Sequence, residues 1–269
     1  MAPGASTNSD SFPGVPSLEP VTPSTGWGVL HLFLRARQGE AGGDRLLEHV
    51  TAFAAGDAQQ VVAFSVLGAR ADLGVMALAS DLDALDRLTK RILAGPVDPV
   101  ASFVSLTELS EYTSTEDDER TRLAAAAGEP DLEAKLEEWR TRMAAYHEAR
   151  LHPQLPERRV IAFYPMAKTR RPGANWYELD FAERKRLMMG HATVGRRYSG
   201  RILQLITGAT GLDDWEWGVT LLADDPVAIK DIVYEMRFDT VSATYGEFGP
   251  FWTGLVMNPS DLLARVGLT

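Results

Sequence analysis

The strongest constraint in this sequence is one order of predicted elements that occurs twice. Alternating apolar residues indicate strands, and apolar residues spaced three and four apart indicate helices. The first half predicts a strand over 28–37, a helix over 44–55, strands over 60–68 and 73–80, a helix over 80–93 and a strand over 103–114. The second half predicts a strand over 159–168, a helix over 179–198, strands over 201–209 and 215–223, a helix over 225–237 and a strand over 242–257. Each half therefore has the order β-α-β-β-α-β.

This order is that of the ferredoxin-like unit and predicts an α+β fold built from two such units. Two units in one chain can place their sheets side by side with the helices outside, which gives a barrel-like core and a pocket on one sheet face. The expected organisation is a disordered tail over 1–25, an N-terminal unit over 26–115, a helical connector over 116–156 and a C-terminal unit over 157–269.

The chain has no cysteine, which excludes disulfides, thiolate zinc sites, iron–sulfur clusters and cysteine nucleophiles. Its longest apolar runs, such as 61–69, are far shorter than the roughly 20 residues of a membrane helix. The N-terminal segment is rich in Pro, Ser, Thr and Gly and lacks the basic and apolar regions of a signal peptide, so we expect a disordered tail. A strap that packs on a neighbouring subunit is the alternative. These features favour a cytoplasmic protein.

The charge is distributed unevenly along the chain. The formal net charge of −10 argues against general nucleic-acid binding. Between Arg158 and Arg201, however, eleven Lys and Arg stand against three acids, which gives this basic island a local charge of +8. Such an island is most often a solvated face or an interface. The sharper alternative is a pocket for a small polyanion.

His191 is the first candidate for chemistry. It lies in a predicted helix with apolar residues one turn away on each side, Leu187 and Val194. A packed core histidine is the common outcome for this pattern. No carboxylate lies three or four positions away to pair with the ring, so a single axial ligand to haem iron is the alternative. Gly190 and Gly195 would let a flat ring approach the helix, whereas zinc-ligand spacing is absent.

The segment YPMAKTRRPGANWY (164–177) is the second candidate. Tyr164 and Lys168 are either strand core and a solvated cation, or a redox-capable phenol and an anion-binding amine that face one pocket. Trp176 is expected to pack, although an aromatic ring near an oxidant can also carry an electron hole. Asp213, Asp214 and Glu216 resemble paired carboxylates for acid–base work. Their place in a hairpin turn favours a structural role.

Four motifs together resemble the chlorite dismutase-like family, and within it the coproheme decarboxylases of Gram-positive bacteria. They are YPMAKTR with NWY, LMMGHATVGRRYSG, QLITGATGLDDWEWGVTL and VYEMRFDTVSATYGEFG. The resemblance is strong from Arg150 to Phe251 and weaker over 27–115. It implies a dimeric α+β barrel, usually in a homopentamer, that binds iron porphyrin in its C-terminal half.

The resemblance also assigns roles to individual residues. It implies that His191 is the axial iron ligand and that Tyr164 forms the catalytic radical. It places Lys168 on a propionate and Gln204 on the distal side of the porphyrin. The other substrate-binding positions that it implies are Arg150, Pro165, Met166, Ala167 and Ser242. Some actinobacterial relatives use a distal histidine as the base that activates peroxide, and His152 is the residue that could take this part; a loop histidine is the alternative.

The activity implied by the resemblance is peroxide-dependent coproheme decarboxylation. Fe-coproporphyrin III would be both substrate and redox cofactor, and hydrogen peroxide the oxidant. The Tyr164 radical would abstract hydrogen from a propionate, and loss of CO2 would leave a vinyl group. Two propionates would react in turn through a three-propionate intermediate to give haem b. A transient contact with the ferrochelatase that supplies coproheme is a further expectation, and neither nucleic acid nor membrane insertion is expected.

Two other functions stay open from the sequence. A chlorite-decomposing or peroxidase-like haem enzyme is the first, although chlorite dismutases have an arginine where this chain has Gln204. A haem carrier or sensor without turnover is the second. A radical-forming phenol with a lysine four residues later would serve no purpose in plain binding.

Overall fold

The computed structural model describes residues 20–125 and 131–268. Residues 1–19, which make up most of the segment 1–25 predicted as a disordered tail, lie outside the described residues. At the end of that segment, the Val21 N–H donates to Asp81 Oδ1 at 3.0 Å and the Val21 carbonyl accepts from the Leu82 N–H at 3.0 Å. The chain therefore enters the fold along the N-terminus of a helix before its first strand begins.

The N-terminal half forms a ferredoxin-like unit, as the sequence predicts. Its elements are β1 (Gly28–Ala36), α1 (Gly43–Ala54), β2 (Gln59–Val66), β3 (Leu73–Ala79), α2 (Leu82–Leu93) and β4 (Val97–Thr107). The strands pair antiparallel in the order β4-β1-β3-β2. Since consecutive residues of a strand point to opposite faces, one face of this sheet meets the helices and the other faces the second half of the chain.

The C-terminal half repeats this topology with additions. The repeated elements are β5 (Val160–Lys168), α5 (Phe181–Arg196), β8 (Ile202–Gly208), β9 (Trp217–Ala223), α6 (Pro226–Met236) and β11 (Trp252–Val256). Their strands pair in the matching order β11-β5-β9-β8. The additions are β6 (Arg170–Arg171), β7 (Ala174–Asn175), the 3-10 turn η1 (Trp176–Glu178), α7 (Thr240–Tyr245), β10 (Gly246–Phe248) and α8 (Pro259–Arg265).

Two edge pairings join the two sheets into one barrel. Strand β2 pairs with β11 through Val66 and Gly254, and β4 pairs with β8 through Leu106 and Gly208. The strands therefore form a closed ring, β5-β11-β2-β3-β1-β4-β8-β9. Aromatic side chains fill its interior: the ring of Phe33 stacks on Trp252 at 4.2 Å between centroids. The predicted α+β barrel of two ferredoxin-like units is confirmed.

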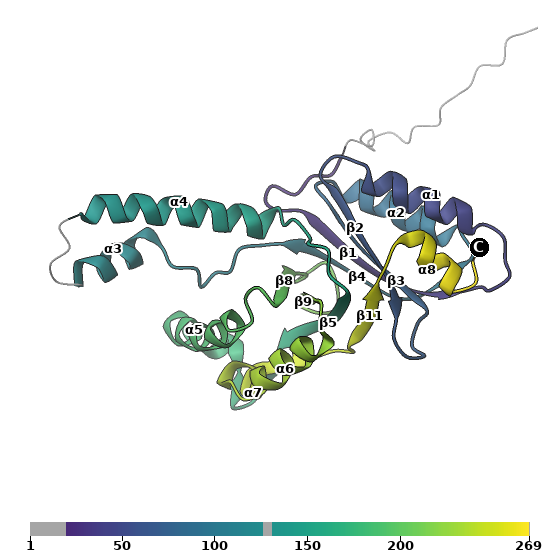
Figure 1. The fold of residues 1–269 in the computed structure, drawn as a ribbon. Coiled ribbons are helices and arrows are strands. Elements are labelled where there is room, and N and C mark those ends of the chain that lie inside the picture. Colours follow the sequence, from purple (N-terminus) through teal and green to yellow (C-terminus); the bar gives the residue numbers. More distant parts are fainter. Residues whose placement is uncertain (1–19, 126–130, 269) are drawn as a thin grey trace, which may run out of the picture.

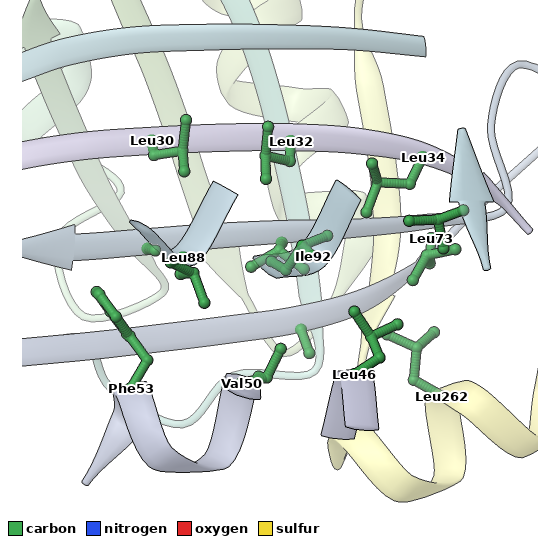
Figure 2. Packing of buried hydrophobic residues seen from close by; sticks show 14 of the residues in the cluster. Leu30, Leu32, Leu34, Leu46, Val50, Phe53, Leu73, Leu88, Ile92 and Leu262 are labelled. Carbon is green, nitrogen blue, oxygen red and sulfur yellow. The ribbon is translucent and has the colours of Figure 1, made fainter. Parts of the chain in front are cut away.

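A second core lies outside the barrel, under the N-terminal helices. Figure 2 shows leucines of β1 facing side chains of α1 and α2, with Leu262 of α8 beside them. Leu262, Leu263, Val266 and Leu268 are all buried there. The sequence grouped 157–269 as one C-terminal unit, but the end of the chain crosses back and completes the N-terminal core.

Two predicted strands differ from the structure. Strand β4 begins at Val97 and ends at Thr107, so residues 108–114 leave the sheet. The predicted strand over 242–257 is divided into α7, β10 and β11. Asp239 begins α7 by accepting the N–H of Val241 at 2.9 Å. Pro250 lies between β10 and β11, and it has no N–H for a sheet bond.

The connector is helical, as expected. Helices α3 (Glu116–Ala125) and α4 (Leu132–Leu151) contact each other and project from the barrel as an arm in Figure 1. Leu123 and Leu136 are buried in this arm, and Arg140 pairs with Glu116 across it at 2.6 Å. None of the helices in 20–125 or 131–268 is long and apolar enough to span a membrane.

Candidate functional site

A cavity of about 650 Å³ lies on the outer face of the C-terminal sheet. One wall is the outward face of β5, β8 and β9, and the opposite wall comes from α5, α6 and α7. Strand alternation selects the first wall: Phe163 and Leu205 point into the barrel core, while Tyr164 and Gln204 line the cavity. Apolar side chains line most of both walls, among them Met166, Met188, Ile206, Val219, Val233 and Met236. The volume and lining are typical of a small-molecule or cofactor site.

His191 lies on the helical wall and has an acidic partner. Its Nδ1 is 3.0 Å from Oδ2 of Asp239, the residue that precedes α7. Burial acts to raise the pKa of Asp239, but the hydrogen bonds from His191 and Ser242 outweigh it and lower the pKa to about 2. A carboxylate on Nδ1 fixes the orientation of the ring and leaves Nε2 for a ligand in the cavity. The sequence did not reveal this pair, because Asp239 is distant along the chain.

Tyr164 lies on the strand wall, opposite the helical wall that carries His191, and aromatic rings enclose it. Its side chain is 7% exposed and stacks on Phe251 with centroids 4.4 Å apart, while Phe248 meets it edge-on at 6.0 Å. The hydroxyl makes no hydrogen bond to any residue that the structure describes. Burial raises the pKa of Tyr164 to about 12, so the phenol is protonated at neutral pH.

Lys168 lies on the same outward face of β5, four residues after Tyr164. It is 7% exposed, and its Nζ is 4.8 Å from the centroid of the Trp176 ring. Burial lowers the pKa of Lys168 to about 8, opposed by the negative charges of Asp239 and Glu216. Within 20–125 and 131–268, no carboxylate lies at ion-pair distance from this ammonium. The amine is therefore available to an anion in the cavity.

Arg150 and Ser242 also line the cavity, from α4 and α7. The guanidinium of Arg150 donates from Nη2 to the Ile206 carbonyl at 3.4 Å, and its Nε is buried without a partner among the described residues. An orphaned buried donor costs stability unless another group accepts from it. Arg150 thus supplies a second cation to the cavity lining.

Gln204 lies on β8 and bridges the two walls. Its Nε2 donates to the carbonyl of Gly195 on α5 at 3.2 Å. A Cβ at Gly195 would lie 3.3 Å from that same nitrogen and 3.4 Å from Met236 Cε. The missing side chain at Gly195 therefore lets the strand wall and the helix wall approach closely at this end of the cavity.

Three sequence-predicted residues lie elsewhere. Pro165 and Ala167 alternate with the lining residues of β5, and neither lines the cavity; their neighbours are Gly249 and Glu247. His152 directs its Nδ1 to Oε1 of Glu148 at 2.9 Å, and its ring lies 5.3 Å from that of Trp27. It is not among the cavity-lining residues.

The basic island is mostly neutralised by acids from other parts of the chain. Arg158 pairs with Asp224, Arg170 with Glu216, Arg184 with Glu111, Lys185 with Asp118 and Arg197 with Glu235. Of the island's cations, all of which the structure describes, Lys168 alone lines the cavity. Arg150 and Arg237, which lie outside the island, supply the other cations of the lining. The local charge of +8 therefore does not describe the field in the cavity.

Sequence reasoning also missed an acidic residue of the lining. Glu108 follows β4 and accepts from Trp217 Nε1 at 3.0 Å. Burial raises the pKa of Glu108, and the Trp217 hydrogen bond and the charge of Arg150 oppose the rise. Its place inside the strand predicted over 103–114 concealed it. No group of three or more His, Asp or Glu in the described residues could hold a metal ion.

Comparisons with known proteins identify relatives of this chain. Two curated relatives, each named "Putative heme-binding protein", come from Natronomonas pharaonis and Halobacterium salinarum. The first is 39% identical over 266 residues and the second 40% over 205, covering 92% and 75% of this chain but 42% and 39% of the relatives. The chain thus spans about two fifths of the length of these curated relatives.

Solved structures share the fold. A protein from Thermus thermophilus, described as a novel heme-binding protein, is 34% identical and has a TM-score of 0.73, over 93% of this chain and 100% of its own. A chlorite dismutase variant from Candidatus Nitrospira defluvii is 15% identical with a TM-score of 0.65, over 91% of this chain and 97% of its own, and supports the fold alone. The family model described as chlorite dismutase matches residues 43–257, which is most of the chain. The chain therefore belongs to the chlorite dismutase family.

Proposed function

We propose that this protein is a coproheme decarboxylase, which uses hydrogen peroxide to convert two propionates of Fe-coproporphyrin III to vinyl groups and so forms haem b. The observation that carries the proposal is the placement of Tyr164 and Lys168 on one face of β5, in the cavity whose helical wall bears His191. The family and the names of the relatives support the binding of an iron porphyrin.

The residues of the cavity fit a porphyrin with several carboxylates. His191 has its Nδ1 bonded to Asp239, so Nε2 remains for the iron. Lys168 and Arg150 line the cavity as cations that form no ion pair with a described residue, and propionates would pair with them. The apolar side chains of both walls suit the faces of a flat macrocycle. When bound, the iron porphyrin supplies the chemistry by which peroxide removes electrons from the site.

Each decarboxylation removes two electrons from one propionate. The carboxylate, one hydrogen peroxide and one proton give a vinyl group, one CO2 and two waters. Tyr164 would abstract a hydrogen atom from the β-carbon after losing its own. With a pKa of about 12 the phenol is protonated at neutral pH, so oxidation of Tyr164 would require its proton to pass to an acceptor supplied by the bound substrates.

Lys168 would hold the reacting carboxylate beside Tyr164. Its position on the same strand face, two side chains along, keeps the amine and the phenol in a fixed relation. Holding reactants in a productive geometry can contribute roughly 7–11 kcal/mol to lowering a barrier. Gln204 on β8 would face the porphyrin from the strand wall, where chlorite dismutases have an arginine, and this substitution disfavours chlorite as the substrate.

The proposal is tested with ferric coproheme, hydrogen peroxide and the purified protein. Mass spectrometry should show two successive losses of CO2, first to a three-propionate product and then to haem b, with two peroxides consumed for each haem. Bleaching of the porphyrin without a decarboxylated product would refute the proposal. Oxygen release from chlorite at a comparable rate would support the chlorite dismutase activity in its place, and tight binding without turnover would support a haem carrier.

We also propose that the protein acts as a homopentamer in the cytoplasm and receives coproheme by transient contact with the ferrochelatase that makes it. The family resemblance supports both statements. Light scattering coupled to size-exclusion chromatography measures the subunit number. Transfer of coproheme from the ferrochelatase faster than its spontaneous release would support direct contact, and transfer at the rate of release would exclude it.

A further inference from the structure

Glu216 is a buried carboxylate beside the cavity, outside its lining. It is 7% exposed and immediately precedes β9. Its Oε2 accepts the main-chain N–H of Lys168 at 2.7 Å, and its own N–H donates to the Met166 carbonyl at 3.1 Å. Its carbonyl accepts from the Ala209 N–H at 2.7 Å. Glu216 is thus fixed against the end of β5 at the residue whose amine enters the cavity.

Two further side chains enclose this carboxylate. Oε1 pairs with the guanidinium of Arg170, which lies over the ring of Tyr177 at 4.5 Å. The Tyr177 hydroxyl also bonds to Glu216, and burial together with this bond raises the pKa of Tyr177. A buried carboxylate is costly unless donors satisfy it. Here the backbone N–H of Lys168, one guanidinium and one phenol do so.

Two hydrogen bonds also fix the main chain of Thr169, the residue after Lys168. The Thr169 N–H donates to the Tyr245 carbonyl at 2.9 Å, and the Thr169 carbonyl accepts from the Trp176 N–H at 3.0 Å. With its backbone fixed on both sides, Lys168 can vary its position mainly through its side-chain torsions. The Trp176 ring, whose centroid is 4.8 Å from Nζ, limits those torsions further.

We propose that Glu216 is a positioning residue for Lys168: it fixes the main chain at the cavity edge and supplies negative charge that keeps the amine an ammonium ready to bind a carboxylate. This inference rests on the proposed function in its assignment of Lys168 as the propionate anchor. The charged groups that act on this ammonium are the carboxylates of Glu216 and Asp239, and Arg170 offsets part of the charge of Glu216.

The first test uses the protein without ligand. Lysine labelled with ¹³C at Cε reports the titration of Lys168 by NMR, and the signal is assigned by its absence in Lys168→Met. Glu216→Gln should move the midpoint to lower pH, because a carboxylate that favours the ammonium is lost. Arg170→Gln should move it to higher pH, because the charge of Glu216 is no longer offset.

Arg170→Gln also keeps the inference testable if Glu216→Gln fails to fold. The Arg170 side chain is 63% exposed, so its replacement should leave the fold intact even if Glu216→Gln does not fold. Asp224→Asn is the matched control, since Asp224 pairs with Arg158 beyond the other end of β9. A Lys168 midpoint that stays fixed in both Glu216→Gln and Arg170→Gln, or that moves equally in Asp224→Asn, overturns the inference.

The second test is a double-mutant cycle on the affinity for ferric coproheme. Binding is measured from the change in the absorption spectrum of the coproheme. Glu216→Gln should weaken binding on the order of tenfold in the wild-type background, about 1.4 kcal/mol. It should have no further effect in a Lys168→Met background, because the two residues act through one contact. Equal weakening in both backgrounds would show a general structural role and refute the inference. A wild-type protein that binds coproheme but releases no CO2 refutes only the proposed function.

Discussion

Nδ1 of His191 lies 3.0 Å from Oδ2 of Asp239, across the gap between α5 and the start of α7. Asp239 has two tasks, because its other oxygen accepts the N–H groups that begin α7. The orientation of the candidate iron ligand is therefore coupled to the helix that carries Ser242 into the cavity. This pair determines which imidazole nitrogen faces the cavity.

Replacement of Asp239 by Asn should separate these two tasks. Asn caps helices about as well as Asp, so thermal stability should change little. The neutral amide gives the imidazole less negative charge than the carboxylate does. The reduction potential of bound iron porphyrin should therefore rise, and activity should fall roughly 10- to 100-fold. Potentiometric titration and resonance Raman of the iron–histidine stretch measure the effect. An unchanged potential would mean that His191 is not the axial ligand.

Tyr164→Phe should abolish decarboxylation and leave the fold intact. The hydroxyl makes no hydrogen bond to a described residue, so its removal should change the free energy of unfolding by less than about 1 kcal/mol. Ferric coproheme should still bind with a similar spectrum. Mass spectrometry of the peroxide reaction gives the result, and haem b formed at the native rate would exclude Tyr164 as the radical site.

Lys168→Met should stabilise the protein most at neutral pH. The pKa of Lys168 is about 8 in the folded state, below its ordinary value of 10.5, so between these pH values the unfolded chain binds more protons. Wild-type stability therefore rises with pH through this window, and the cost of the buried ammonium is greatest below pH 8. The variant lacks that cost, on the order of 1–3 kcal/mol. Its advantage in chemical denaturation should shrink between pH 8 and 10.5; an advantage that is constant with pH would contradict the buried charge.

Arg150→Gln should weaken coproheme binding more than haem b binding, because Arg150 lines the cavity as a cation and coproheme has more propionates to pair with it than haem b. Loss of one charge-assisted hydrogen bond corresponds to roughly 10- to 100-fold in affinity. Arg158→Gln is the control, since Arg158 also has a buried unpartnered Nε but pairs with Asp224 away from the cavity. Equal losses in the two variants would remove Arg150 from the site.

His31 should make the barrel sensitive to acid. It is fully buried in the barrel, stacks on Phe163 at 4.0 Å and has its Nε2 2.9 Å from Thr220 Oγ1. Burial lowers the pKa of His31 from 6.5 to about 3, so below pH 6.5 the unfolded chain takes up a proton that the folded chain does not. Stability should therefore fall as pH drops through this range.

Urea unfolding at neutral pH and at about two pH units lower measures this effect. His31→Gln keeps a side chain that can bond to Thr220 but cannot titrate. Its loss of stability between the two pH values should be smaller than that of the wild type by about 2 kcal/mol. Parallel losses in the two proteins would show that other groups control the acid sensitivity.

The local pattern of the sequence was sufficient for the fold class and for part of the site. Strand alternation placed Tyr164 and Lys168 on one face, and helical spacing placed His191 on an apolar face, because both periodicities follow from backbone geometry alone. The repeated order of elements predicted the two ferredoxin-like units. Alternation could not locate the end of β4 or the break at Pro250, since both depend on where pairing with neighbouring strands stops.

The tertiary structure decided which charges and hydrogen bonds meet. It paired His191 with Asp239, paired five cations of the basic island with acids outside it, and brought Glu216 against Lys168. It also carried α8 back to the N-terminal core. None of these contacts has a period along the chain, because an ion pair or hydrogen bond requires only that two groups lie within a few ångströms in space. The sequence by itself determined the helices, the strands and their apolar faces. Which charged and polar side chains meet was decided only when the strands closed into the barrel and the helices packed on it.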